Sequence, residues 1–127
     1  MGKLVSKISN SEVEVMKVLW NAEGELTLTE IRTTLQQTSE WESSTIKTLL
    51  RRLCKKGVVE ISKREVFYYS PNVSKVEYNE YTTQSLIDKI YAGSAKKLVA
   101  ALVGSKKLNE KDIKELKSMF KVGNDNE

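Results

Sequence analysis

The chain has 127 residues, of which 39% are hydrophobic and 30% charged, so it fits one soluble domain or a small domain with an appendage. It has no histidine and one cysteine, which leaves little for a metal site, a catalytic centre or a disulfide, and we expect neither an enzyme nor a cofactor. No apolar run approaches the roughly 18 residues of a membrane span, and no signal peptide is recognisable, so we expect a cytoplasmic protein without membrane insertion.

The positive charge is concentrated in one part of the chain. The net charge is only +4, but the stretch from Ser43 to Arg64 carries seven lysines and arginines against the single acid Glu60. Elsewhere acids and bases nearly cancel. A localised basic surface is the electrostatic signature of a protein that binds nucleic acid.

The N-terminal part predicts two short helices from their capping signals. Ser9-Asn-Ser-Glu12 has the spacing of a capping box, and Ser11–Glu14 is an alternative one step later; the helix that follows ends near Asn21. Thr27-Leu-Thr-Glu30 repeats the spacing and predicts a second helix that fades near Gln37.

A third, basic helix is predicted between Glu42 and Gly57. Four apolar residues recur at helical spacing on one side: Ile46, Leu49, Leu50 and Leu53. Hydroxyls and cations occupy the other sides, which suits either a solvated surface or the major groove of DNA. On the second interpretation the expected DNA contacts, including two from the hairpin below, are Ser43, Ser44, Thr45, Lys47, Thr48, Arg51, Arg52, Lys55, Lys63 and Arg64.

After Gly57 the hydrophobic period changes from helical to two. Residues 58–61 and 66–69 predict the strands of a hairpin, with a basic turn at 62–65. Helix, helix, basic helix and hairpin is the order of a winged helix-turn-helix. We therefore expect a DNA-binding domain at residues 8–71, with Trp41 as a packing residue before the basic helix.

Residues 75–121 predict a second domain of three helices, followed by a disordered tail at 122–127. These helices show more apolar surface than about 50 residues bury alone, which predicts a homodimer. The residues expected at the dimer interface are Tyr81, Leu86, Ile90, Leu98, Leu102, Ile113, Leu116 and Phe120. Tyr78, Tyr81 and Tyr91 could instead line a ligand pocket, although core packing is commoner.

Several segments resemble the penicillinase repressor (BlaI/MecI/CopY) family of winged-helix transcriptional regulators. The similarity extends from about Ile8 to Phe120, and the basic helix is its most specific part. The resembling segments are Ile8–Met16, Val18–Trp20, Trp41–Leu53, Lys55–Gly57, Phe67–Pro71, Tyr91–Gly93, Leu98–Val99 and Leu108–Leu116.

The resemblance implies a mainly α fold with a small β-wing, and a dimeric repressor of a pseudo-palindromic, double-stranded operator. In the BlaI/MecI branch, such repressors control β-lactamase or penicillin-binding-protein genes. A membrane β-lactam sensor causes their cleavage in the dimerisation region. The family's base and phosphate contacts correspond to Thr45, Lys47, Thr48, Arg51 and Arg52.

Three positions depart from the family pattern. Glu42 replaces the usual serine cap of the basic helix, and Ser43 is an alternative cap. Ala101-Leu102 aligns with the Asn-Phe bond that is cut in staphylococcal members. Because the two residues differ, Ala101 and Leu102 are either a cleavage site or ordinary core residues. The Cys-x-Cys pairs of the copper branch are absent from the sequence, which places the chain nearer BlaI/MecI; we expect Cys54 to be a packing residue.

Two other hypotheses remain: a regulator of the same family that answers a different signal, and a winged-helix module that binds a protein. DNA binding at low salt separates the second from a repressor.

Overall fold

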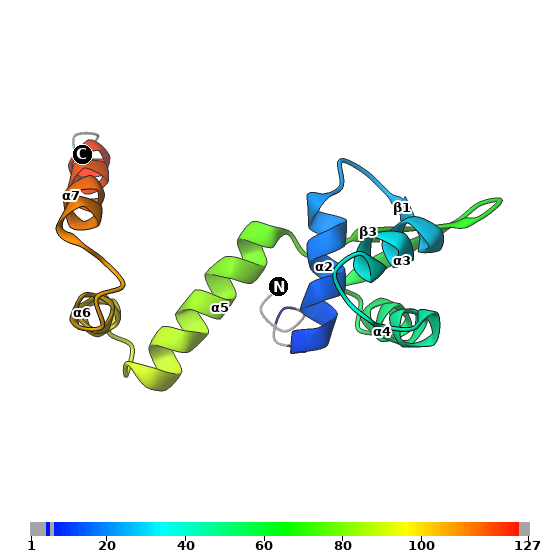
Figure 1. Cartoon of the computed structure of the whole chain (residues 1–127), viewed down its shortest axis with the longest axis horizontal. Coiled ribbons are helices and arrows are strands. Elements are labelled where there is room, and N and C mark those ends of the chain that lie inside the picture. The colour runs from blue at the N-terminus through cyan, green and yellow to red at the C-terminus, as the bar shows by residue number, and fades with distance from the viewer. Residues whose placement is uncertain (1–4, 6, 125–127) are drawn as a thin grey trace. The chain divides into compact units, whose positions relative to one another are not determined.

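The computed structural model describes residue 5 and residues 7–124, and it divides the chain into two compact units, Met1–Thr82 and Thr83–Glu127. The first unit contains three helices and a small sheet, in the order of a winged helix-turn-helix (Figure 1). This confirms the predicted fold class. The elements keep the labels of Figure 1.

Three helices form the body of the first unit: α2 (Asn10–Asn21), α3 (Leu28–Gln36) and α4 (Ser43–Lys55). Ser9 caps α2, and Glu12 closes a complete capping box, so the first of the two predicted boxes is the one present. Thr27 and Glu30 form the same motif at the start of α3. Each box satisfies backbone N–H groups that an isolated helix end leaves unpaired.

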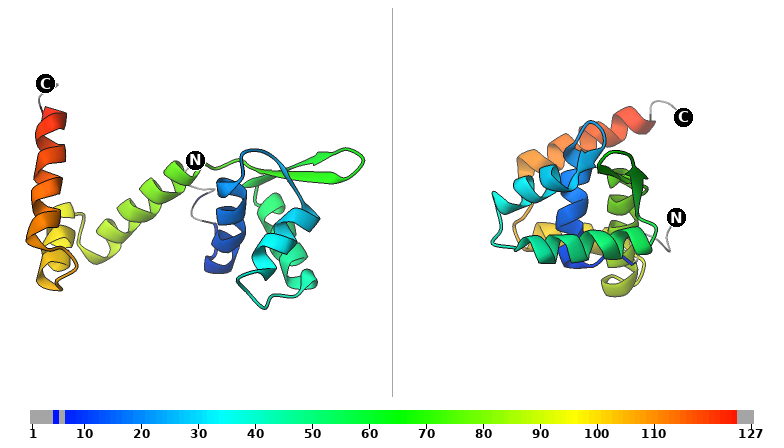
Figure 2. Two further views of the ribbon diagram at one scale, coloured as in Figure 1. Left: turned by 45° about the horizontal axis from the view of Figure 1, so that its top comes forward. Right: turned by 90° about the vertical axis from the view of Figure 1, so that its right-hand side faces the viewer.

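The sheet has three antiparallel strands, one more than the predicted hairpin. β2 (Val59–Lys63) pairs with β3 (Phe67–Pro71), and β1 (Leu26–Thr27) pairs with the other edge of β3. The sequence indicates a short extended segment at residues 25–28, which β1 confirms, but not its pairing with β3, because two residues are too few to show a period of two. The turn between β2 and β3 lies at residues 64–66, whereas the sequence predicted it at residues 62–65. Figure 2 shows that this turn projects beyond the helices.

The core of the first unit lies between the three helices and the sheet. Ile46, Leu49, Leu50 and Leu53 of α4 are all buried in it, as their spacing predicts. The other large side chains that are almost completely buried include Met16, Leu19, Ile31 and Val58. Trp41 packs against this cluster and is partly buried, which confirms its expected role.

The second unit consists of the later part of α5 (Lys75–Ile90), α6 (Ala95–Gly104) and α7 (Glu110–Asn124). Ser94 caps α6 through the N–H of Lys97, and Asn109 and Asp112 cap α7 reciprocally. The segment expected to be a disordered tail begins inside α7, since the helix continues to Asn124; residues 125–127 lie outside the described part.

The first two turns of α5 belong to the first unit. The Trp20 indole N–H donates to the carbonyl of Val73 at 2.7 Å, and its ring lies 5.3 Å from the ring of Tyr78. Val73 is completely buried. The division between the units consequently lies within α5, after Thr82, and not at the polar joint before residue 75. Tyr78 packs against the core of the first unit.

Candidate nucleic-acid interface

Helix α4 begins without a side-chain cap. Glu42 occupies the N-cap position, but its carboxylate accepts no capping hydrogen bond, and Ser43 is already the first helical residue. The first N–H groups of α4 are therefore available at a helix N-terminus, where the backbone partial charge favours an anion such as phosphate.

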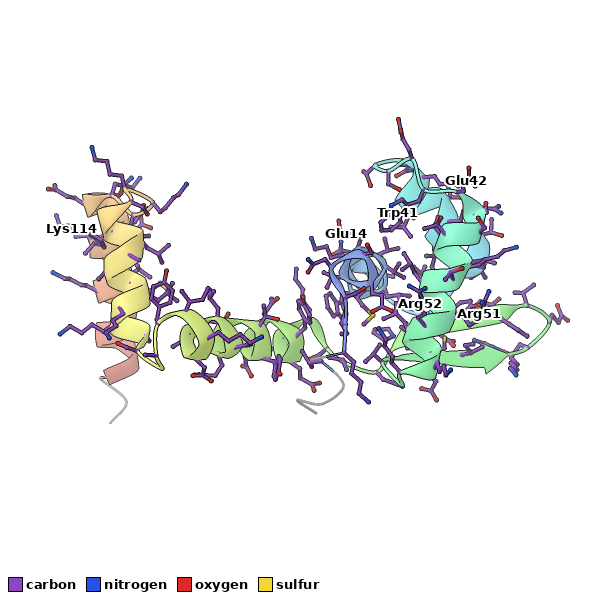
Figure 3. All side chains as sticks on the ribbon, turned by 90° about the horizontal axis from the view of Figure 1, so that it is seen from below. Glu14, Trp41, Glu42, Arg51, Arg52 and Lys114 are labelled. Carbon is purple, nitrogen blue, oxygen red and sulfur yellow. The ribbon has the colours of Figure 1, made fainter. Side chains whose placement is uncertain are left out.

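The solvent side of α4 carries the cations and hydroxyls that the sequence predicts as DNA contacts. Six of the eight candidates on this helix are exposed, and Ser43 and Thr48 are half-buried. The exposed six are Ser44, Thr45, Lys47, Arg51, Arg52 and Lys55. Figure 3 labels Arg51 and Arg52 on α4.

Thr48 has part of its hydrogen-bonding capacity used within the helix. Its hydroxyl donates to the Ser44 carbonyl at 2.9 Å, so its oxygen remains available as an acceptor. The exposed side therefore combines guanidinium and ammonium donors with short polar groups. In the major groove, such groups pair with guanine edges, adenine edges and phosphate oxygens.

The wing tip holds both predicted cations against aromatic rings. The Lys63 ammonium lies 5.7 Å from the centre of the Phe67 ring, and the Arg64 guanidinium lies 4.0 Å from that of Tyr68. Arg64 also forms an ion pair with Glu25. Sequence reasoning missed this pair, because the two residues are 39 positions apart and no periodic pattern connects them.

Lys56 belongs to the basic stretch, but it points toward the protein. Its ammonium donates to the Glu12 carboxylate at 2.5 Å and to the Lys7 carbonyl at 2.8 Å. Burial raises the pKa of Glu12, but hydrogen bonds from Lys56 and Ser9 and the charge of Lys56 outweigh burial and hold that pKa below its ordinary value. This ion pair fixes the end of α4 against the start of α2.

Cys54 packs against the core from the side of α4. Burial raises the pKa of its thiol, so the reactive thiolate is disfavoured. Its partly buried position supports the packing role over a redox role.

The second unit exposes much of its apolar surface. Among the predicted dimer residues of this unit, Leu86, Ile90 and Leu116 are exposed, whereas Leu98, Leu102 and Ile113 are half-buried. Tyr81, at the end of the first unit, is also exposed. The side chain of Phe120 lies outside the described part. Val99, Val103 and Met119, which were not among the predicted dimer residues, add to this surface, and Met119 is 69% exposed.

Two kinds of feature are missing among the described residues. No group of three histidine, cysteine, aspartate or glutamate side chains is placed to hold a metal ion. No described helix has the length and apolar character required to cross a membrane.

Comparison with known proteins finds relatives over most of the chain. The chain is 35% identical to the penicillinase repressor of Bacillus licheniformis over 115 residues, which are 90% of this chain and 89% of that protein. It is 32% identical to the penicillinase repressor of Staphylococcus aureus, with 90% of each chain covered. It is 31% identical to the methicillin resistance regulatory protein MecI of Staphylococcus aureus (strain N315), covering 90% of this chain and 93% of MecI.

Solved structures match the first unit. The solution structure of the DNA-binding domain of the repressor BlaI aligns with a TM-score of 0.53 and 40% identity, covering 58% of this chain and 90% of that one. Monomeric Bacillus licheniformis BlaI, solved with the blaP half-operator, aligns with a TM-score of 0.51 and 41% identity, covering 57% of this chain and 88% of that one. The family model described as "Penicillinase repressor" matches residues 8–121. The chain belongs to the penicillinase repressor family.

Proposed function

We propose that this protein is a dimeric transcriptional repressor that binds a pseudo-palindromic operator. In this proposal the exposed side of α4 lies in the major groove, and Lys63 and Arg64 of the wing reach the adjacent backbone. The observation that carries the proposal is the arrangement of α4, with four leucine and isoleucine residues buried on one side and Lys47, Arg51, Arg52 and Lys55 exposed on the others.

The relatives support the choice of ligand. A structure 41% identical to this chain was solved with a half-operator, and the chain aligns with 88% of it. An α-helix fits the major groove, and arginine can donate two hydrogen bonds to one guanine, so the exposed guanidiniums supply sequence readout while the lysines supply attraction to phosphate.

The exposed apolar surface of the second unit supports dimerisation. Ile90 and Leu116 are 65% and 48% exposed, which is unfavourable for a monomer in water. Two copies that bury this surface carry two α4 helices, which matches two half-sites of a palindrome.

The names of the relatives, penicillinase repressor and methicillin resistance regulatory protein, support a proposal for the controlled genes. The release mechanism is proposed from the family resemblance alone. We infer that the protein represses β-lactam resistance genes and is released when a membrane β-lactam sensor pathway leads to cleavage in the dimerisation region. Ala101 and Leu102, at the aligned position, lie within α6, with Ala101 exposed and Leu102 half-buried. A protease needs an extended segment, so cleavage there requires local unfolding of α6.

The experiment that tests the proposal is in-vitro selection from a random duplex library with the purified full chain. Enrichment of one pseudo-palindromic sequence, bound by two copies, is the expected result. Binding of all duplexes alike, or of none at low salt, would refute sequence-specific repression and favour a winged-helix module that binds a protein.

A further inference from the structure

Arg64 of the wing differs from the other cations that are predicted to contact DNA. Its guanidinium donates a hydrogen bond to the carboxylate of Glu25, the residue directly before β1, and lies 4.0 Å from the centre of the Tyr68 ring. Among the residues that the structure describes, no other predicted DNA contact has an ion pair with an acid. One candidate for a phosphate contact therefore already has an anionic partner within the chain.

The two cations of the wing lie on opposite faces of the hairpin. Lys63 pairs with Phe67 across the hairpin, and Phe67 shares a face of β3 with the buried Tyr69, because side chains two residues apart point the same way. Arg64 lies over Tyr68, whose side chain points to the other face. The wing thus presents an ammonium beside one ring and a guanidinium held by a second ring and a carboxylate.

The Arg64–Glu25 pair is open to solvent and lies within one compact unit. The two side chains are 51% and 40% exposed, so a DNA phosphate can reach the guanidinium. The Tyr68 ring attracts that group through its π electrons, which leaves the N–H donors free to change partner. All three residues belong to the first unit, so the change of partner depends only on contacts inside it.

We propose that Glu25 attenuates DNA binding, because its carboxylate competes with DNA phosphate for the Arg64 guanidinium and thereby lowers the affinity of the protein for every duplex. The inference rests on the proposed function, in which Arg64 reaches the DNA backbone. Glu25 does not touch DNA in this scheme. It acts through Arg64 and is therefore a positioning residue of the interface.

The physical reason is that binding replaces one ion pair by another. A guanidinium forms similar charge-assisted hydrogen bonds with a carboxylate and with a phosphate, so the loss of Glu25 offsets part of the attraction between Arg64 and the backbone. A phosphate that approaches Arg64 while the pair is intact also meets the carboxylate, and the two anions repel each other. An exposed ion pair is weak, so the expected attenuation is about two- to fivefold in affinity.

The test compares the full chain with the variants Glu25→Gln, Arg64→Ala and Glu25→Gln/Arg64→Ala, on the selected duplex and on a random duplex at two salt concentrations. The matched control is Glu23→Gln, because Glu23 is another exposed acid of the loop before β1 and has no ion pair with a described residue. This control removes the same charge without releasing Arg64. Thermal unfolding shows that each variant is folded, and Glu25→Ala replaces Glu25→Gln if the latter lacks the wild-type transition.

For Glu25→Gln we expect the affinity for both duplexes to rise by about two- to fivefold, beyond any rise in Glu23→Gln. The rise should shrink at the higher salt concentration, because salt screens the ion pair. In the Arg64→Ala background, Glu25→Gln should change the affinity no more than Glu23→Gln does.

Three results overturn the inference. One is an effect of Glu25→Gln that is the same with and without Arg64, and another is an effect equal to that of Glu23→Gln. The third is a loss of affinity in Glu25→Gln, which would mean that Glu25 holds Arg64 in the position that binds DNA.

Failure of the proposed function has a different result. If selection with the wild-type protein enriches no sequence, the repressor proposal fails, whereas a rise in affinity of Glu25→Gln for the random duplex still supports competition for Arg64. If the wild-type protein prefers its selected duplex and Glu25→Gln behaves like Glu23→Gln, the repressor proposal stands and the role of Glu25 is refuted. A wild-type protein that binds no duplex refutes both.

Discussion

Arg51 and Lys63 differ in what their side chains recognise. Arg51 is exposed on α4 and can form two hydrogen bonds with a guanine, whereas the Lys63 ammonium, beside the Phe67 ring of the wing, is a compact charge suited to a phosphate. We predict that Arg51→Ala or Arg52→Ala weakens operator binding by about 1–3 kcal/mol and relaxes specificity. Lys63→Ala should weaken binding to all duplexes alike and reduce the salt slope by about one.

Fluorescence anisotropy with the operator and a scrambled duplex distinguishes the two effects. The matched control is Lys17→Ala, which removes a cation paired with Glu14 on α2. If Arg51→Ala and Arg52→Ala, like Lys63→Ala, lose the same affinity for the operator and for the scrambled duplex, then α4 does not read the sequence.

Glu12 is a buried acid whose pKa lies below its ordinary value because Lys56 and Ser9 hydrogen-bond to its carboxylate. A lowered folded-state pKa means that its stabilisation is fully present above the unfolded value of about 4.5 and is lost as the pH falls through the folded value. We predict that Glu12→Gln lowers the free energy of unfolding at pH 7 by about 1–3 kcal/mol. Glutamine keeps the capping box, so the change reports the charge.

Urea denaturation at pH 7 and pH 3 measures this contribution. The difference between wild type and Glu12→Gln should shrink at pH 3, because Glu12 of the unfolded chain takes up a proton below about 4.5 and the stabilisation is lost progressively from there. An equal difference at both pH values would mean that the ion pair with Lys56 does not stabilise the fold. Glu14→Gln, on the exposed side of α2, is the control.

At the scale of elements, Thr27 has two roles, because it is the last residue of β1 and the cap of α3. Its hydroxyl accepts from the N–H of Glu30 at 3.2 Å. We predict that Thr27→Ala lowers the free energy of unfolding by about 1 kcal/mol. Thr29→Ala, an exposed position in the same helix, should change it little, and urea denaturation of the two variants makes the comparison. Equal effects would contradict the capping role.

Local signals in the sequence were sufficient to predict the helices. The capping boxes at Ser9 and Thr27 and the apolar stripe of α4 depend on residues three or four positions apart, and the structure confirms them. The predicted exposure of Arg51 and Arg52 follows from the same helical geometry.

Contacts between distant residues could not be predicted in this way. The pairing of Leu26 with Tyr69, the ion pair of Lys56 with Glu12 and the bond from Trp20 to Val73 each join separate elements. No local period encodes them, because they depend on how the elements pack. For this reason the boundary between the two units was predicted from the sequence at the polar segment before residue 75, whereas in the structure the two compact units meet within α5, after Thr82.

At the scale of the whole molecule, the apolar surface of the second unit predicts an effect on association. Leu116 is half exposed on α7, and a carboxylate there would have to be buried in the proposed dimer. We predict that Leu116→Glu raises the dimer dissociation constant by about tenfold or more. Sedimentation equilibrium measures it, with the exposed neighbour Lys117→Glu as the control. An unchanged dimer would place the interface elsewhere.

The most direct measurement of the central claim is a titration of the full chain against its selected operator at two salt concentrations, with random duplex as competitor. We predict a discrete complex containing two copies of the protein, resistant to the competitor, whose affinity falls steeply as salt rises because phosphate contacts release counterions. If random duplex displaces the protein as effectively as unlabelled operator does, or if binding does not depend on salt, then α4 and the wing are not a sequence-specific DNA interface.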